Sequence, residues 1–155
     1  MFNFPMQKPG ELGVARQFVK SGQIGGTNYL GGTAPLTANG TTIFRLGGLC
    51  GRKAMAVRLG ATAVTVPVSP GALTAKLVKY NAVTNAAVDL TQNLDLEALI
   101  TREEAFVGLL AAVMDTPAAV IGPNDALEVH VVSDNATISP QPVGLVFTAE
   151  VFMLE

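Results

Sequence analysis

LVFTAEVFM, residues 145–153, places a nonpolar side chain at every second position near the C-terminus of this chain, with Thr148 and Glu150 between them. Its nonpolar set is Leu145, Phe147, Ala149, Val151 and Met153. Side chains of a β-strand point alternately to its two faces, so a period of two predicts a strand with one buried face. This stretch therefore predicts a half-buried strand.

Three more runs show the same alternation. They are Met55, Val57 and Leu59; Val64, Val66 and Val68, interrupted by Pro67; and Leu127, Val129 and Val131 around Glu128 and His130. Turn residues separate the runs at Gly47-Gly48, Gly60, Ser69-Pro70-Gly71, Asn81, Asn85 and residues 122–125 and 139–142. Short strands at this spacing predict a mainly β fold over residues 39–155, an antiparallel sandwich or barrel.

Residues 102–114 fit two structures. Thr101 and Glu104 match a capping box, and Phe106, Leu109 and Val113 follow at helical spacing, which predicts a short helix. The same nonpolar residues also fit a buried strand pair, because short nonpolar runs do not discriminate between the two. We favour the strand because the flanking segments are all predicted to be β.

Residues 1–38 differ in composition from the rest. Eight of the 16 glycines lie in the first forty residues, which excludes a long helix or a central strand, although Val14–Lys20 has room for one or two helical turns. The segment is nevertheless too nonpolar for an ordinary disordered tail. We therefore predict an extended arm that orders against its own domain or a neighbour, the alternative being an unstructured N-terminus. Its predicted contact residues are Phe2, Phe4, Phe18, Tyr29 and Leu30.

The charges are sorted along the chain. Residues 1–88 carry nine basic side chains and one acidic one, whereas residues 89–155 carry eleven acidic side chains and one basic one, for a net charge of −2. Opposite halves of this kind attract each other within one fold or between copies. If early strands lie beside late ones, a basic strand next to an acidic strand helps to set the pairing.

The composition predicts contact with another chain. Only 14% of the residues are charged and 49% are hydrophobic, whereas about 25% charged is usual. A small domain with so few charges leaves nonpolar side chains on its surface, and such surface is commonly used for oligomerisation or docking.

Catalytic and metal sites find little support in the residue inventory. One histidine and one cysteine, His130 and Cys50, cannot form a zinc site, and the alternation places His130 on the outward face of a strand. No Gly-x-Ser-x-Gly motif is present. We expect no enzyme activity, no metal and no cofactor.

Nucleic-acid and membrane partners are also not expected. The basic residues between Arg45 and Lys79 have only Phe44 and Tyr80 as neighbouring aromatics, and the chain has no Trp for base stacking. The longest nonpolar run, residues 105–114, is too short to span a bilayer, and no signal peptide is evident. Together with the single cysteine, which cannot form an intrachain disulfide, these features predict synthesis in a reducing cytoplasm.

Three segments resemble the capsid decoration (cement) proteins of tailed bacteriophages. They are LTAKLVKY at residues 73–80, GPNDALEVHVVS at residues 122–133 and QPVGLVFTAEV at residues 141–151. The resemblance covers roughly residues 41–155. It implies a jelly-roll-like β-sandwich that binds the outside of an icosahedral capsid as a homotrimer or similar oligomer. The major capsid protein would be its partner, and its role would be to bridge capsomers against the pressure of packaged DNA.

A second function is a carbohydrate-binding sandwich on a virion or cell surface. Sugar sites usually stack sugar rings on exposed aromatic side chains. The chain has no Trp and only two Tyr, which makes this the weaker expectation.

Overall fold

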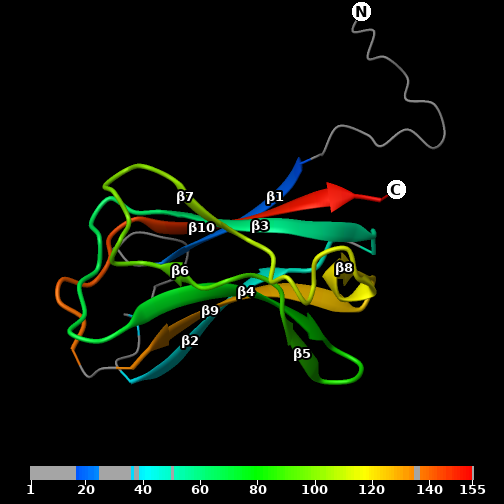
Figure 1. Cartoon of the computed structure of the whole chain (residues 1–155), viewed down its shortest axis with the longest axis horizontal. Helices are drawn as coiled ribbons and strands as arrows, with labels where there is room; N and C mark the ends of the chain where they lie inside the picture. The colour runs from blue at the N-terminus through cyan, green and yellow to red at the C-terminus, as the bar shows by residue number, and fades with distance from the viewer. Residues whose placement is uncertain (1–16, 25–35, 37–38, 50, 135–136, 155) are drawn as a thin grey trace, which may run out of the picture.

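Two antiparallel sheets face each other and enclose a core of nonpolar side chains (Figure 1). The structure is a computed structural model that describes residues 17–24, 36, 39–49, 51–134 and 137–154, with backbone alone for 17–24. The predicted mainly β, antiparallel sandwich is confirmed.

The sheets combine strands from both halves of the sequence. Sheet A has the order β1 (Gln17–Ile24), β10 (Leu145–Met153), β3 (Ala54–Thr62) and β7 (Ala105–Gly108), and β8 (Val120–Ile121) also pairs with β3. Sheet B has the order β2 (Gly40–Gly47), β9 (Asp125–Ser133), β4 (Leu73–Asn81) and β5 (Ala86–Asp89), and β6 (Leu94–Asp95) also pairs with β4. Early and late strands therefore lie side by side in each sheet.

The alternation of β10 and β9 sets the two inner faces of the sandwich. Leu145, Phe147, Ala149 and Val151 are buried from sheet A, and Leu127, Val129 and Val131 are buried from sheet B. The ring of Phe147 meets that of Phe44 on β2 with a centroid distance of 6.0 Å and a tilted geometry. The prediction for both stretches is confirmed.

The prediction for residues 55–59 is confirmed at Leu59, which is buried, but has the wrong phase at Met55 and Val57. Arg58 lies opposite Glu150 and Ala56 lies opposite Val151, so Val57 is an extra residue on β3 without a partner in β10. An extra residue of this kind reverses which face the following side chains occupy. The buried residues are therefore Ala54 and Ala56 before the bulge and Leu59 and Ala61 after it, while Met55 and Val57 are only half-buried.

Residues 102–114 contain a strand, and the helical alternative is wrong. Residues 105–108 pair with β3 as β7, and residues 111–115 form a turn. Arg102 and Asp115 have positive φ angles of 64° and 59°, which an α-helix does not accommodate. Packing against β3 and the core overrides the local helix signal, because Leu109 and Val113 are buried where the chain turns.

Two further expectations are corrected in the same region of the sandwich. Gly60, expected in a turn, lies within β3 beneath the ring of Phe106, where an added Cβ would come within 2.8 Å of Phe106 Cε1. Residues 64–68, expected as a strand, form a loop that has one isolated bridge, between Thr65 and Val143. Pro67 lacks the N–H that a continuous ladder needs.

The predicted arm, residues 1–38, contains one strand among the residues described. Gln17–Ile24 form β1 at the edge of sheet A, paired with β10 from Gln17 opposite Phe152 to Ile24 opposite Leu145. Residues 17–20 are therefore extended, and the expected helical turns at Val14–Lys20 are wrong over that part. The rest of the arm, apart from the buried Leu36, lies outside the described residues.

Candidate functional site

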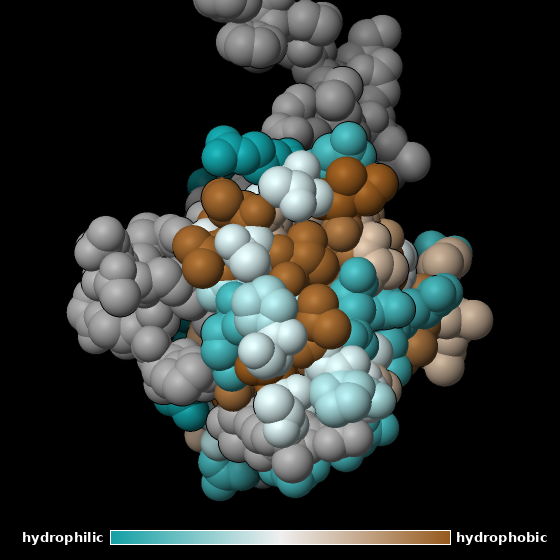
Figure 2. Space-filling model, turned by 90° about the vertical axis from the view of Figure 1, so that its left-hand side faces the viewer, coloured by the Kyte–Doolittle hydropathy of each residue, from teal (hydrophilic) through white to brown (hydrophobic). Residues whose placement is uncertain are grey.

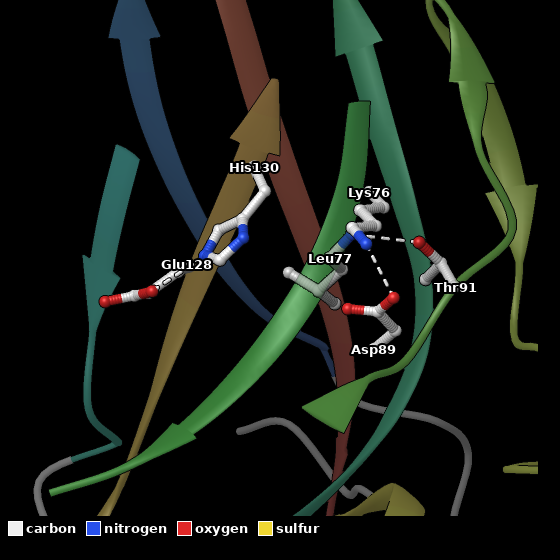
Figure 3. Close-up of polar contacts among 6 residues, drawn as sticks. All are labelled: Lys76, Leu77, Asp89, Thr91, Glu128 and His130. Carbon is white, nitrogen blue, oxygen red and sulfur yellow. Dashed lines mark hydrogen bonds and ion pairs between the residues drawn. The ribbon is translucent and has the colours of Figure 1, made fainter. Parts of the chain in front are cut away.

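A polar cluster on the outer face of sheet B is centred on Glu128 of β9 (Figure 3). Glu128 is only 4% exposed, yet its side chain points away from the core because it alternates with Leu127 and Val129. Its Oε2 lies 2.9 Å from His130 Nε2, and its Oε1 lies 3.2 Å from Arg45 Nε on β2. Two partners from adjacent positions thus satisfy a buried carboxylate.

The neighbouring strands β4 and β5 carry a second ion pair. Lys76 Nζ lies 2.6 Å from Asp89 Oδ2 (Figure 3). Just beyond β5, the buried Thr91 accepts a hydrogen bond of 2.9 Å from the backbone N–H of Leu77 through its Oγ1. The Thr91 side chain thus accepts the hydrogen bond from a backbone N–H of β4 at a point where β5 has already ended.

Sheet A has a matching pair on its outer face. Arg58 of β3 lies directly opposite Glu150 of β10, and its Nε donates to Glu150 Oε2. The guanidinium carbon also lies 3.8 Å from the centre of the Phe106 ring on β7, a cation–π contact. Arg58 therefore connects three strands.

The ion pairs explain part of the sorted charges. Arg45–Glu128, Arg58–Glu150 and Lys76–Asp89 each join a basic residue of the first half to an acidic residue of the second. Each pair lies between hydrogen-bonded strands. The prediction that basic and acidic strands neutralise each other within the fold is confirmed for these pairs.

Lys79 bonds to backbone carbonyls and not to a carboxylate, because it is on the inner face of β4. Its Nζ donates to the backbone carbonyls of Ala118 and Val120 at 2.7 and 2.8 Å. These carbonyls belong to the 3₁₀ turn Pro117–Ala119 and to β8 of the opposite sheet. The ammonium group thus ties the two sheets together at that edge.

The polar groups offer limited chemistry. His130 is on the outward face of its strand, as predicted, and its contact with Glu128 gives the imidazole an orienting carboxylate. Across the part of the chain that the structure describes, no group of three or more His, Cys, Asp or Glu side chains is placed to hold a metal ion. The arrangement described is that of cross-strand pairs that stabilise sheets.

A different kind of surface lies at one end of the sandwich, and we call it the apolar end surface. It consists of Val64, Val68, Ile100 and Val143, which are 43%, 51%, 61% and 44% exposed. Figure 2 shows nonpolar side chains gathered on this end of the molecule. The four residues come from three loops that follow β3, β6 and β9.

Backbone hydrogen bonds hold these loops together. Val64 and Thr65 both donate to the carbonyl of Val143, and Val68 donates to that of Pro140. The N–H of Arg102 donates to Ala63 O at 2.8 Å, which places the turn after Ile100 beside the first valine. The exposed nonpolar side chains therefore project from loops that are joined to one another by backbone hydrogen bonds.

The residues predicted as contacts are only partly placed by the structure. Phe2, Phe4, Tyr29 and Leu30 lie outside the described residues, and Phe18 lies on β1, where the backbone is opposite Val151. Sequence reasoning missed the apolar end surface, because it assigned Val64 and Val68 to a half-buried strand. The interruption at Pro67 was the available signal that this run is a loop.

Within the described ranges, no helix is long and nonpolar enough to cross a bilayer. No protein-family model matches the chain, and no curated protein matches it significantly.

Proposed function

We propose that this chain is a structural virion protein that binds the outside of an icosahedral phage capsid and stabilises it by bridging capsomers. Its partners are the major capsid protein and further copies of itself in a homotrimer. It acts without catalysis, cofactor, nucleic acid or membrane. It is made in the host cytoplasm and works on the capsid exterior.

The apolar end surface is the observation that supports this proposal most. Four nonpolar side chains, each more than 40% exposed, stand together on loops that are tied by backbone hydrogen bonds. A contiguous nonpolar patch on a small domain commonly marks a contact with another chain. The described ion pairs, by contrast, join strands within the fold.

The antiparallel sandwich also fits the resemblance to capsid decoration proteins. The strands at residues 73–81, 125–133 and 145–153 correspond to the three segments that carry this resemblance. A contact repeated over a whole capsid needs only modest affinity at each position if each oligomer engages several capsomers.

Co-sedimentation with capsids tests the proposal. The full chain is mixed with capsids of the virus that encodes it, and with an unrelated capsid as a control for non-specific adsorption. We expect saturable binding at a fixed ratio to capsid protein and a higher capsid melting temperature, on the cognate capsid alone. A folded chain that stays in the supernatant when cognate capsids sediment would contradict the proposal.

The carbohydrate-binding alternative has less support in the described residues. Phe106 is the large aromatic side chain there that is more than 40% exposed, and the Arg58 guanidinium already lies over its ring. Tyr80 uses its hydroxyl to donate to Asn85 at 2.6 Å. A specific hit on a glycan array, together with no capsid binding, would favour this alternative.

A further inference from the structure

We propose that the apolar end surface binds the N-terminal segment, residues 1–16, of a neighbouring copy of this chain. The contact deepens the assembly role proposed above by naming the partner of that surface. This proposal depends on the proposed capsid function only for the biological use of the contact, because copies of the chain can associate without a capsid.

The composition of the segment suits the surface. Residues 1–16 contain Phe2, Phe4, Met6, Leu12 and Val14, with only three charged side chains. Aromatic and Met side chains are enriched at the centre of protein interfaces. The loops that carry the surface are joined by hydrogen bonds of Val143 and Val68, so binding costs little conformational entropy on that side.

The path of β1 directs the segment toward another copy. Gln17 is opposite Phe152 and Ile24 is opposite Leu145, two residues from Val143, so β1 runs toward the apolar end surface of its own copy. The segment before Gln17 therefore enters at the far end, near the C-terminus (Figure 1). Eight residues of strand separate the two ends by about 25 Å. A neighbour placed end to end presents its surface directly, whereas the same copy's surface requires a complete reversal.

Charge favours the same pairing. Asp95, Glu103, Glu104 and Asp134 are exposed on the loops and strand ends around the apolar end surface, beside Arg102. The N-terminal segment carries Lys8 and Arg16 against Glu11. A nonpolar segment with excess positive charge thus meets a nonpolar surface with excess negative charge, which aids association and its orientation.

A contact between one end and the opposite end is heterologous. Such contacts form rings when the rotation closes and open filaments when it does not. Three copies that each pass their segment to the next form a closed trimer when each contact turns the next copy by about 120°. This agrees with the oligomer expected from the resemblance.

The test uses the full chain and measures its mass in solution by light scattering. One variant changes the segment, Phe2→Ser with Phe4→Ser, and a second changes the surface, Val64→Ser with Val143→Ser. The control is Val83→Ser, which alters a valine that is 71% exposed on the turn between β4 and β5. We expect wild type and control at three times the monomer mass and both double variants at the monomer mass. Circular dichroism verifies that each variant is folded. If the double surface variant does not fold, the single variant Val68→Ser is used in its place.

Mixing the two double variants distinguishes exchange between copies from docking within one copy. The surface variant has an intact segment and the segment variant has an intact surface, so an equimolar mixture can form one contact per pair. We expect heterodimers in the mixture and only monomers in either variant alone. A monomeric wild type, folded variants that keep the wild-type mass, or a mixture without heterodimers would each overturn the proposal.

Capsid binding is scored separately in the same proteins. If the wild-type oligomer dissociates in the variants but never binds capsids, the capsid function fails and this contact stands. If capsids are bound while the oligomer is unaffected by either double variant, this contact fails and the capsid function stands.

Discussion

The outer faces of the two sheets and the apolar end surface use their side chains in opposite ways. On the faces, Arg45, Arg58 and Lys76 meet acidic partners on adjacent strands. At the end, Val64, Val68, Ile100 and Val143 stay exposed on loops. The faces thus use their charges to hold strands together, whereas the end keeps nonpolar area that the described residues of one copy leave exposed. Function is therefore to be sought at the end.

The largest loss in the free energy of unfolding is expected in the core between the two sheets. Phe147 is fully buried and packs against Phe44, so Phe147→Ala leaves a cavity and is expected to lower the free energy of unfolding by about 3–5 kcal/mol. Urea denaturation of the purified chain measures this loss. Phe147→Leu is the matched control and should retain most of the stability. A loss below about 1 kcal/mol for Phe147→Ala would show that this position is not part of a packed core.

The polar cluster on sheet B should come next. Glu128→Ala removes the partner of both His130 and Arg45 and is expected to cost about 2 kcal/mol, the range for hydrogen bonds to a charged group. Glu128→Gln retains the size and one acceptor and should cost less. Equal stability of Glu128→Ala and wild type would mean that the buried carboxylate does not support the face.

Sequence reasoning succeeded where the chain alternates without interruption. The inner faces of β9 and β10 follow the period of two, and the sorted charges indicated that early and late strands meet. It failed where one residue changes the register, as at Val57, and where tertiary contact decides the conformation, as at Gly60 beneath Phe106. The pattern cannot reveal a bulge before the partner strand is known.

The apolar end surface was not predictable for a related reason. Its four residues come from loops far apart in the sequence, which meet because residues 64–68 hydrogen-bond to residues 139–143 and Ala63 accepts from Arg102. Val64 and Val68 have the spacing of a buried face, but nothing in that spacing tells whether a second sheet covers it. The predicted contacts in the arm, Phe2 and Phe4, are instead tested by the exchange experiment above.

The pair on sheet A should contribute less than the Glu128 cluster. A double-mutant cycle with Arg58→Ala and Glu150→Ala is expected to give a coupling energy of about 0.5–1 kcal/mol, kept low because the Arg58 side chain is 42% exposed and solvent screens the pair. Repeating the cycle in 1 M NaCl should reduce the coupling. Strictly additive single variants would show that the pairing of charges on this face is without consequence for stability.

The smallest effect on folding is expected at the end surface itself. Val68 is 51% exposed, so Val68→Ser should change the free energy of unfolding of the single copy by no more than about 0.5 kcal/mol. Val129→Ser is the matched change at a fully buried valine and should cost on the order of 3 kcal/mol, because it leaves a cavity and buries a hydroxyl. Both are measured by urea denaturation at a protein concentration low enough to populate the monomer, since association would add to apparent stability. If Val68→Ser cost as much as Val129→Ser, the end would belong to the core of one copy, and it would no longer be the surface through which copies meet.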